Sequence, residues 1–209
     1  MRGYEGSEGD AAADDAEIGM YRDAAAAVNE ALRRGIPRSR IIAHGYSLGG
    51  VLAAAAAQQH QLAALVLDHA FCNLGAAANN QFSHGYGYAR LPQFMWDGVA
   101  RGAFNKRDLG EIEEGHTVKT DSCDNIAKLQ NYKGGLVVIY GTEDPICTPA
   151  DAQTLLAAHT SGLQASLCID GGHHNIQFYD DRLDQLRFAK QLKLVLALQA
   201  DIARLAIVL

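Results

Sequence analysis

Four short, largely apolar stretches lie along the chain, and each has the length of a β-strand. They cover residues 40–44, 64–68, 136–140 and 165–169. The second, Ala-Leu-Val-Leu-Asp, is a continuous apolar run, which is typical of a strand that is buried on both faces of a parallel sheet. The clearest of them is the third, Leu-Val-Val-Ile-Tyr. We therefore expect about four parallel strands.

Helical patterns separate these runs. Residues 16–34 predict a helix that ends at Gly35. A second helix follows the first strand to about residue 60, and a third begins near Pro149, because proline suits a first helical turn. Apolar residues recur at helical spacing over residues 183–205. Strands that alternate with helices predict an α/β fold with a mostly parallel sheet flanked by helices.

The remaining segments carry weaker patterns. Residues 1–15 are rich in glycine, alanine and acidic side chains, and they predict a loop. Residues 71–134 contain many polar turns and no clear strand. Within them we expect short helices near residues 92–104 and 125–130. We interpret residues 1–209 as a single domain.

Polar residues with catalytic chemistry follow three of the strands. Ser47 follows the first, Asp144 the third and His174 the fourth. The carboxyl ends of parallel strands meet at one edge of a sheet, so such residues gather there. A serine hydroxyl attacks a carbonyl only when a histidine takes its proton and a carboxylate holds that histidine in the right tautomer. The three positions therefore predict a Ser-His-Asp triad.

Residues 45–50, Gly-Tyr-Ser-Leu-Gly-Gly, contain Gly-x-Ser-x-Gly between a strand and an alanine-rich helix. This is the context of a nucleophile elbow, a strained turn that lifts the serine hydroxyl out of the sheet. We expect Gly45 and Gly49 to avoid Cβ collisions between strand and helix. The turn also brings the Leu48 N–H to a helix N-terminus, where it can stabilise an oxyanion. The alternative is a glycine-rich turn that only packs, or that binds a phosphate.

The acid and the base each have neighbours that compete for the role. Asp144 lies in a Gly-x-x-Asp-Pro turn, and its alternative role is to stabilise that turn. Glu143 is a weaker candidate, and Asp151 fits better in the first turn of the next helix. His173 and His174 are adjacent, and the residue pattern alone leaves the choice between them open.

The other histidines have no strand-end loop that pairs with an acid in this order. We expect each of them to be structural or exposed: His44, His69, His84, His116 and His159.

Composition and charge exclude several classes of partner. The net charge is −6 without a basic cluster, which argues against nucleic acid. No apolar run is long enough to span a membrane, and we expect no signal sequence, because the first residues contain no apolar stretch. The cysteines lack metal-binding spacing, so we expect free, mostly buried thiols, no metal, no cofactor and a cytoplasmic location. They are Cys72, Cys123, Cys147 and Cys168.

These motifs resemble the α/β-hydrolase superfamily over nearly the whole chain. More narrowly, they are similar to its small, nearly capless serine hydrolases, which include protein depalmitoylases and serine aminopeptidase-like proteins. Residues 2–9 resemble the family loop Arg-Gly-Tyr-Gly-x-Ser-x-Gly, except that Glu5 replaces a glycine. Residues 45–50 resemble the family's elbow, and residues 124–144 the segment that leads to the acid.

The resemblance also selects the base. Residues 172–175, Gly-His-His-Asn, are similar to the family's Gly-x-His-Asn. This similarity implies that His174, rather than His173, is the base.

The start of the chain departs from the family pattern. In the family, the Arg-Gly-Tyr loop lies beyond several strands and a His-Gly loop that donates the second oxyanion-hole N–H. We therefore expect an N-terminally truncated fold whose first strands are missing, with Leu48 as the only donor and a weakened activity. The strand before Ser47 would then lie at an exposed sheet edge, which favours self-association.

In this fold, residues 71–134 occupy the place of a lid. They lack the long amphipathic helices of a large lid, so we expect a reduced one. Their aromatic side chains could form the wall of a shallow apolar groove for an acyl chain, or simply cover the sheet edge: Phe82, Tyr86, Tyr88, Phe94, Trp96 and Phe104.

The leading hypothesis is a serine hydrolase that cleaves an ester or thioester of a small-molecule or acylated substrate. A catalytically impaired hydrolase-fold protein that only binds partners is a second hypothesis, and an aminopeptidase-like amide hydrolase is a third.

Overall fold

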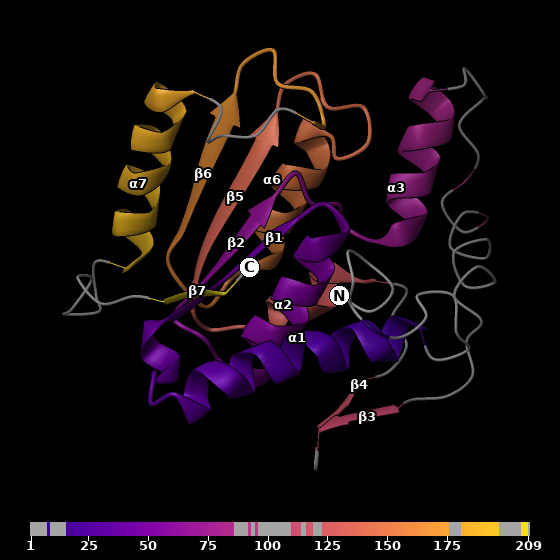
Figure 1. Cartoon of the computed structure of the whole chain (residues 1–209). Coiled ribbons are helices and arrows are strands. Elements are labelled where there is room, and N and C mark those ends of the chain that lie inside the picture. Colours follow the sequence, from indigo (N-terminus) through magenta and orange to yellow (C-terminus); the bar gives the residue numbers. More distant parts are fainter. Residues whose placement is uncertain are drawn as a thin grey trace.

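The protein is described by a computed structural model for residues 8, 16–85, 92, 95, 110–113, 116–118, 123–175, 181–196 and 206–208. In this part of the chain a parallel sheet has the strand order β6-β5-β2-β1-β7 (Figure 1). Its strands are β1 (Ile41–Tyr46), β2 (Ala64–Asp68), β5 (Gly135–Gly141), β6 (Gln164–Ile169) and β7 (Ala206–Val208). A separate antiparallel pair consists of β3 (Gly110–Glu113) and β4 (His116–Val118).

Helices cover both faces of the sheet (Figure 1). Their bounds are α1 (Ala16–Arg33), α2 (Leu48–His60), α3 (Leu74–Asn80), α5 (Asn125–Gln130), α6 (Pro149–Ala158) and α7 (Arg182–Leu196). Helices α2, α5 and α6 form one layer, and α1 packs along α2. Helix α7 packs against β5 and β6 on the opposite face. The α/β architecture expected from the alternating pattern is confirmed.

The continuous apolar runs are explained by this two-sided covering. In β2, Leu65 and Leu67 face the core beneath α2 and α5, whereas Val66 lies in the core beneath α7. In β5, Leu136 belongs to the first core and Val137 to the second. Because successive side chains of a strand point to opposite faces, a strand between two helical layers needs apolar residues at every position.

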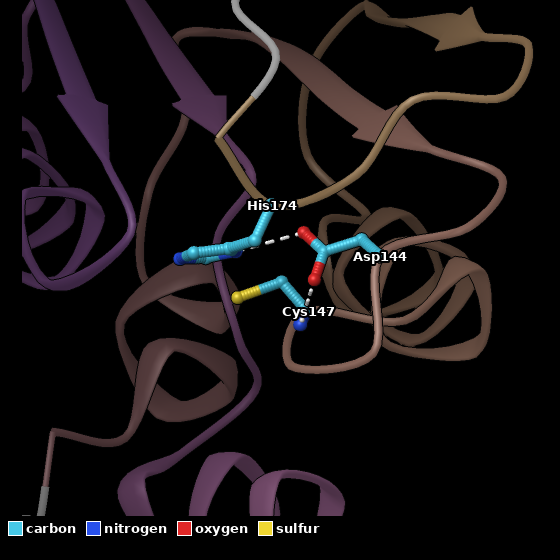
Figure 2. Close-up of side chains that lie close together, drawn as sticks. All are labelled: Asp144, Cys147 and His174. Carbon is cyan, nitrogen blue, oxygen red and sulfur yellow. Dashed lines mark hydrogen bonds and ion pairs between the residues drawn. The ribbon is translucent and has the colours of Figure 1, made fainter. Parts of the chain in front are cut away.

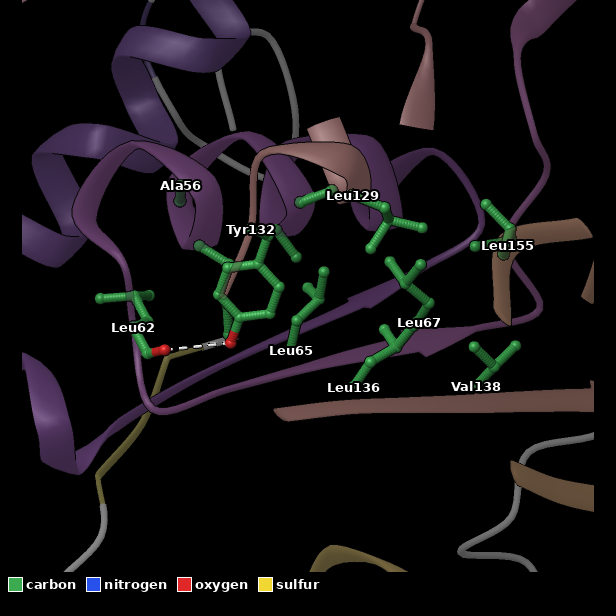
Figure 3. Close-up of a cluster of buried hydrophobic side chains, with 14 of the residues drawn as sticks. Ala56, Leu62, Leu65, Leu67, Leu129, Tyr132, Leu136, Val138 and Leu155 are labelled. Atoms are coloured by element: carbon green, nitrogen blue, oxygen red, sulfur yellow. Dashed lines mark hydrogen bonds between the residues drawn. The ribbon is translucent and has the colours of Figure 1, made fainter. Parts of the chain in front are cut away.

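Figure 3 shows the first of these cores, in which one buried tyrosine needs polar partners. The Tyr132 side chain is fully buried between α2, α5 and the strands. Its hydroxyl lies 3.0 Å from the carbonyl oxygen of Leu62 and 3.3 Å from that of Gly135. Burial raises the pKa of Tyr132 well above its ordinary value, so the hydroxyl stays a neutral donor. This hydrogen bond ties the segments that enter β2 and β5.

The sheet edge beside β1 is covered, which contradicts our expectation. Strand β7 pairs in parallel with β1, from Ile41 opposite Ala206 to Ala43 opposite Val208. The pairing gives hydrogen-bonding partners to backbone groups that would otherwise form an open edge. The prediction that the strand before Ser47 is an exposed edge is therefore wrong at these three positions, because β7 is the outer strand of the described sheet.

Two further differences concern helices. The sequence does not predict α3, which begins after Asn73, because its side-chain oxygen caps the helix by accepting from the Ala76 N–H at 2.8 Å. The predicted C-terminal helix ends at Leu196 rather than continuing unbroken into the β7 segment. The helix over 125–130 is confirmed.

Several predictions lie outside the described residues. They include the loop over most of residues 1–15, the helix near 92–104 and, apart from Phe82, the aromatic residues of the expected lid. Among the described helices, none combines the length and apolarity needed to cross a membrane.

Replacing Tyr132 with phenylalanine tests the role of its hydrogen bond. We expect Tyr132→Phe to lower the free energy of unfolding by about 1–2 kcal/mol, because a buried carbonyl loses its donor while the ring still fills the core. Urea unfolding measures the change. An unfolding free energy that stays within about 0.3 kcal/mol of the wild-type value would contradict this role.

Candidate active site

A single residue, Ser47, forms the turn between β1 and α2, and its backbone is strained. Its φ of 51° and ψ of −119° lie outside the regions that residues with a side chain ordinarily adopt. The Ser47 N–H donates to the carbonyl oxygen of Asp68 at 2.9 Å, and the Gly50 N–H donates to the Ser47 carbonyl at 3.0 Å. Hydrogen bonds to the next strand and to the new helix therefore hold the serine in this conformation.

Gly45 is the residue that lets strand and helix approach so closely. A Cβ on Gly45 would lie 2.1 Å from the carbonyl oxygen of Gly49 and 2.6 Å from the backbone nitrogen of Gly50. A Cβ on Gly50 would lie 2.9 Å from the Cβ of Ala70. A Cβ on Gly49 would meet nothing within 4 Å. We expected Gly45 and Gly49 to be the positions where a Cβ would collide. The structure confirms this for Gly45, but the second such position is Gly50 and not Gly49.

Ser47, Asp144 and His174 come together at the carboxyl end of the sheet. The Nε2 atom of His174 lies 3.1 Å from the Ser47 Oγ. The Nδ1 atom of His174 lies 2.8 Å from the Asp144 Oδ2, and a carboxylate can only accept, so Nδ1–H donates. The Asp144 side chain is fully buried, while that of His174 is 15% exposed. The three predicted residues therefore form one unbroken line of hydrogen bonds.

The second oxygen of Asp144 is also fixed. Oδ1 accepts from the backbone N–H groups of Ile146 at 2.8 Å and Cys147 at 2.9 Å. The loop after β5 packs directly on the loop after β6, since a Cβ on Gly141 would lie 2.1 Å from the Gly172 carbonyl oxygen. These contacts set the distance between the carboxylate and the histidine ring.

The competing candidates lie elsewhere. The His173 ring is 60% exposed, and its Nε2 is 3.2 Å from the carboxylate of Glu143, which is equally exposed. Asp151 caps α6, where its carboxylate accepts from the Thr148 N–H and hydroxyl. The geometry thus brings His174, and not His173, to Ser47.

Cys147 lies beside the histidine and the carboxylate, as Figure 2 shows. One ligand atom each of Asp144, Cys147 and His174 lies within 4.8 Å of the others, a spacing that could hold a metal ion. A metal would need the thiolate, but burial and the nearby Asp144 raise the pKa of the Cys147 thiol well above its ordinary value. The oxygens of Asp144 are also engaged already. The donor set therefore fits a hydrogen-bonded triad better than a metal site.

The cysteines are free, as expected. Cys72, Cys123 and Cys147 are buried, and Cys168 is partly exposed.

A second cluster of polar side chains, which the sequence reading missed, adjoins the triad. Asp68 ends β2 and is fully buried, as is the side chain of His69. The Asp68 carboxylate lies 2.7 Å from His69 Nδ1 and 3.2 Å from His44 Nε2. Burial raises the pKa of Asp68, but the hydrogen bonds from the two histidines outweigh it and hold the pKa below its ordinary value. An Asp-His pair directly after a buried strand was the available signal.

Comparison with known proteins shows what the chain resembles. A family model described as "Alpha/beta hydrolase family" matches residues 1–186. No curated protein matches the sequence. An esterase from Pyrococcus furiosus is 17% identical with a TM-score of 0.60, over 92% of this chain and 66% of that one. The esterase RhEst1 from Rhodococcus sp. is 16% identical with a TM-score of 0.57, over 96% and 79% of the two chains.

A puromycin hydrolase has the same fold at 18% identity and a TM-score of 0.54. The alignment covers 88% of this chain but 25% of the puromycin hydrolase, so this chain spans about a quarter of that protein. At these identities the structural likeness shows the fold alone.

A matched pair of glycine variants tests the close approach at the turn. We expect Gly45→Ala to lower the free energy of unfolding by at least about 2 kcal/mol, because backbone atoms must move to admit the methyl group. Gly49→Ala places its methyl group in open space within a helix and should leave stability unchanged or raise it by up to about 1 kcal/mol. Thermal and urea unfolding of both variants provide the measurement. Equal stability of the two would contradict the steric account.

Proposed function

Because the chain belongs to the alpha/beta hydrolase family, we propose that it is a serine hydrolase that cleaves an ester or a thioester. The observation that carries the proposal is the line of hydrogen bonds from Asp144 through His174 to Ser47. Similarity to esterases supports hydrolysis in general, while the choice of substrate rests on the chemistry argued below.

In this proposal each residue has one role. Ser47 Oγ attacks the acyl carbonyl as its proton passes to His174 Nε2, and Asp144 stabilises the imidazolium that forms. His174 then gives the proton to the leaving alcohol or thiol, which departs as the C–O or C–S bond breaks. A water molecule, deprotonated by the same histidine, hydrolyses the acyl-enzyme and releases the acid.

Leu48 supplies the oxyanion donor in this scheme. It is the first residue of α2, where N–H groups have no acceptor within the helix and the helix dipole favours negative charge. It is the one donor that we assign among the described residues. Removing one of two such donors costs about 10² to 10³ in turnover, so a site with this donor alone would be a slow enzyme.

Esters and thioesters fit this site better than amides. Their leaving groups depart more readily, so they depend less on a strong oxyanion hole. Amide hydrolysis of the aminopeptidase type is the alternative substrate class, and a binding protein without turnover is the alternative function. Cys147 is a poor alternative nucleophile, because the thiolate is the reactive form and its thiol is buried with a raised pKa.

Covalent labelling separates these functions. We expect a fluorophosphonate probe to label the wild-type chain and to leave Ser47→Ala unlabelled, because the activated Ser47 hydroxyl attacks phosphorus and displaces fluoride. Intact-protein mass spectrometry gives the stoichiometry. A wild-type chain that stays unlabelled would favour the alternative of a binding protein without turnover. Labelling that persists in Ser47→Ala would contradict the assignment of Ser47 as the nucleophile.

The same variant serves as the blank for a substrate panel. We expect p-nitrophenyl esters and an acyl thioester to be hydrolysed faster than aminoacyl anilides. A preference for the anilides would overturn the ester assignment and favour the aminopeptidase-like alternative.

The adjacent histidines provide the second test. We expect His174→Ala to lower kcat by about 10⁴ to 10⁶, because the serine loses its base. His173→Ala should keep kcat within about twofold of the wild-type value, since its ring faces solvent and pairs with Glu143. Kinetics on an activated ester measure both. The reverse result would show that the base has been misassigned by one residue.

A further inference from the structure

We propose that the buried Asp68–His69 pair positions the His174 imidazole for proton transfer, an inference that rests on the function proposed above. The pair lies at the end of β2, between the strand that carries Ser47 and the strand that leads to Asp144. Neither residue contacts Ser47 Oγ or the Asp144 carboxylate in the hydrogen bonds described above. They act on the reaction through the histidine ring.

Asp68 fixes the orientation of the His69 ring. One carboxylate oxygen lies 2.7 Å from His69 Nδ1, and the other lies 3.2 Å from His44 Nε2. The His69 N–H also donates to the carbonyl oxygen of Ile139 at 2.9 Å, which anchors its backbone to β5. A ring held by its own hydrogen bond and by its backbone has one orientation to offer to a neighbour.

His69 presents that ring to His174. The two ring centroids are 6.1 Å apart and the planes meet at 85°, an edge-to-face contact. Tyr46 completes the group, with its ring 5.9 Å from that of His69 and 5.4 Å from that of His174. The Tyr46 hydroxyl donates to the backbone carbonyl of His174, so this group of rings holds both the side chain and the main chain of the base.

Two features of His69 are energetically unfavourable, one in its backbone and one in its side chain. Its φ is 47°, which is strained for a residue with a bulky side chain. Its Nε2 is buried and has no hydrogen-bond partner among the described residues, and an unsatisfied buried nitrogen is destabilising. Both features have a reason if the position of the ring matters to the neighbouring base.

The alternative is that the pair only stabilises the junction between β1 and β2. The two roles predict different effects of one variant, His69→Asn. Asparagine carries its amide nitrogen where histidine carries Nδ1, so it can still donate to Asp68, and it tolerates a positive φ better than most residues. The variant therefore keeps the backbone and the hydrogen bond, and it removes the ring that meets His174.

His159→Asn is the matched control. His159 is also a buried histidine stacked on an aromatic ring, with its centroid 5.6 Å from that of Tyr132. It lies at the C-terminal end of α6, beside the segment that enters β5, whereas the triad lies where the strands end. Its loss should lower stability without changing kcat.

The experiment measures kcat and KM on an activated ester, the rate of fluorophosphonate labelling, and urea unfolding for both variants. For His69→Asn we expect kcat and the labelling rate to fall together by about two- to tenfold, with KM within twofold of the wild-type value. Kinetics of His69→Asn that match those of His159→Asn, with a loss of stability alone, would overturn the proposal. A raised KM with unchanged kcat would also overturn it, because His69 would then contact substrate.

Crystal structures of the wild type and His69→Asn keep the test independent of the proposed activity. We expect one orientation of the His174 ring in the wild type and at least one additional orientation in the variant. An unchanged single orientation in the variant would overturn the positioning role. Failure of the proposed function gives a different result, namely a wild-type chain that stays unlabelled or labelling that persists in Ser47→Ala, and leaves this comparison of ring orientations intact.

Discussion

The contact between the backbones of Gly45 and Gly49 constrains everything that follows in the site. Because Gly45 lacks a side chain, the first turn of α2 lies directly against the end of β1. The single residue between them must then adopt a φ of 51°. A serine in that conformation projects from the end of the sheet, at the N-terminus of a helix whose dipole favours negative charge. Strain at one residue thus sets both the position of the hydroxyl and its electrostatic surroundings.

The loops at the carboxyl end of the sheet bring the partners of this serine within reach. The loops after β5 and β6 touch at Gly141 and Gly172, so the carboxylate of the first loop meets the imidazole of the second. Two backbone N–H groups donate to the Oδ1 atom of Asp144, so the carboxylate is held in one orientation. The result is a preorganised acceptor for a positively charged ring, and preorganised groups of this kind need little rearrangement during a reaction.

Much of this arrangement could be predicted from the sequence, because its causes are local. The runs that form β2 and β5 are continuously apolar up to their ends, and Pro149 begins α6 as expected. The positions of Ser47, Asp144 and His174 after strand ends were readable for the same reason. What escaped prediction depends on distant segments. Strand β7 has only three residues, and its place beside β1 is a tertiary pairing without a periodic signal.

The Asp68–His69 pair escaped for a related reason. The apolar run before Asp68 predicts a strand. Nothing in the local sequence indicates that the Asp68 carboxylate lies between His44 and His69. The choice between His173 and His174 likewise needed either the family resemblance or the structure, because adjacent loop residues share the same sequence context. Local pattern thus located the strand ends, and tertiary packing decided which side chains meet there.

Locating the covalent adduct of a fluorophosphonate probe tests the central claim most directly. Trypsin cuts after Arg40 and Arg90, so Ser47 and Ser83 fall in one peptide, and tandem mass spectrometry distinguishes them. If Ser47 is the activated nucleophile, the fragment ions place one adduct on Ser47. An adduct on Ser83, on Cys147 or spread over several side chains would contradict the account.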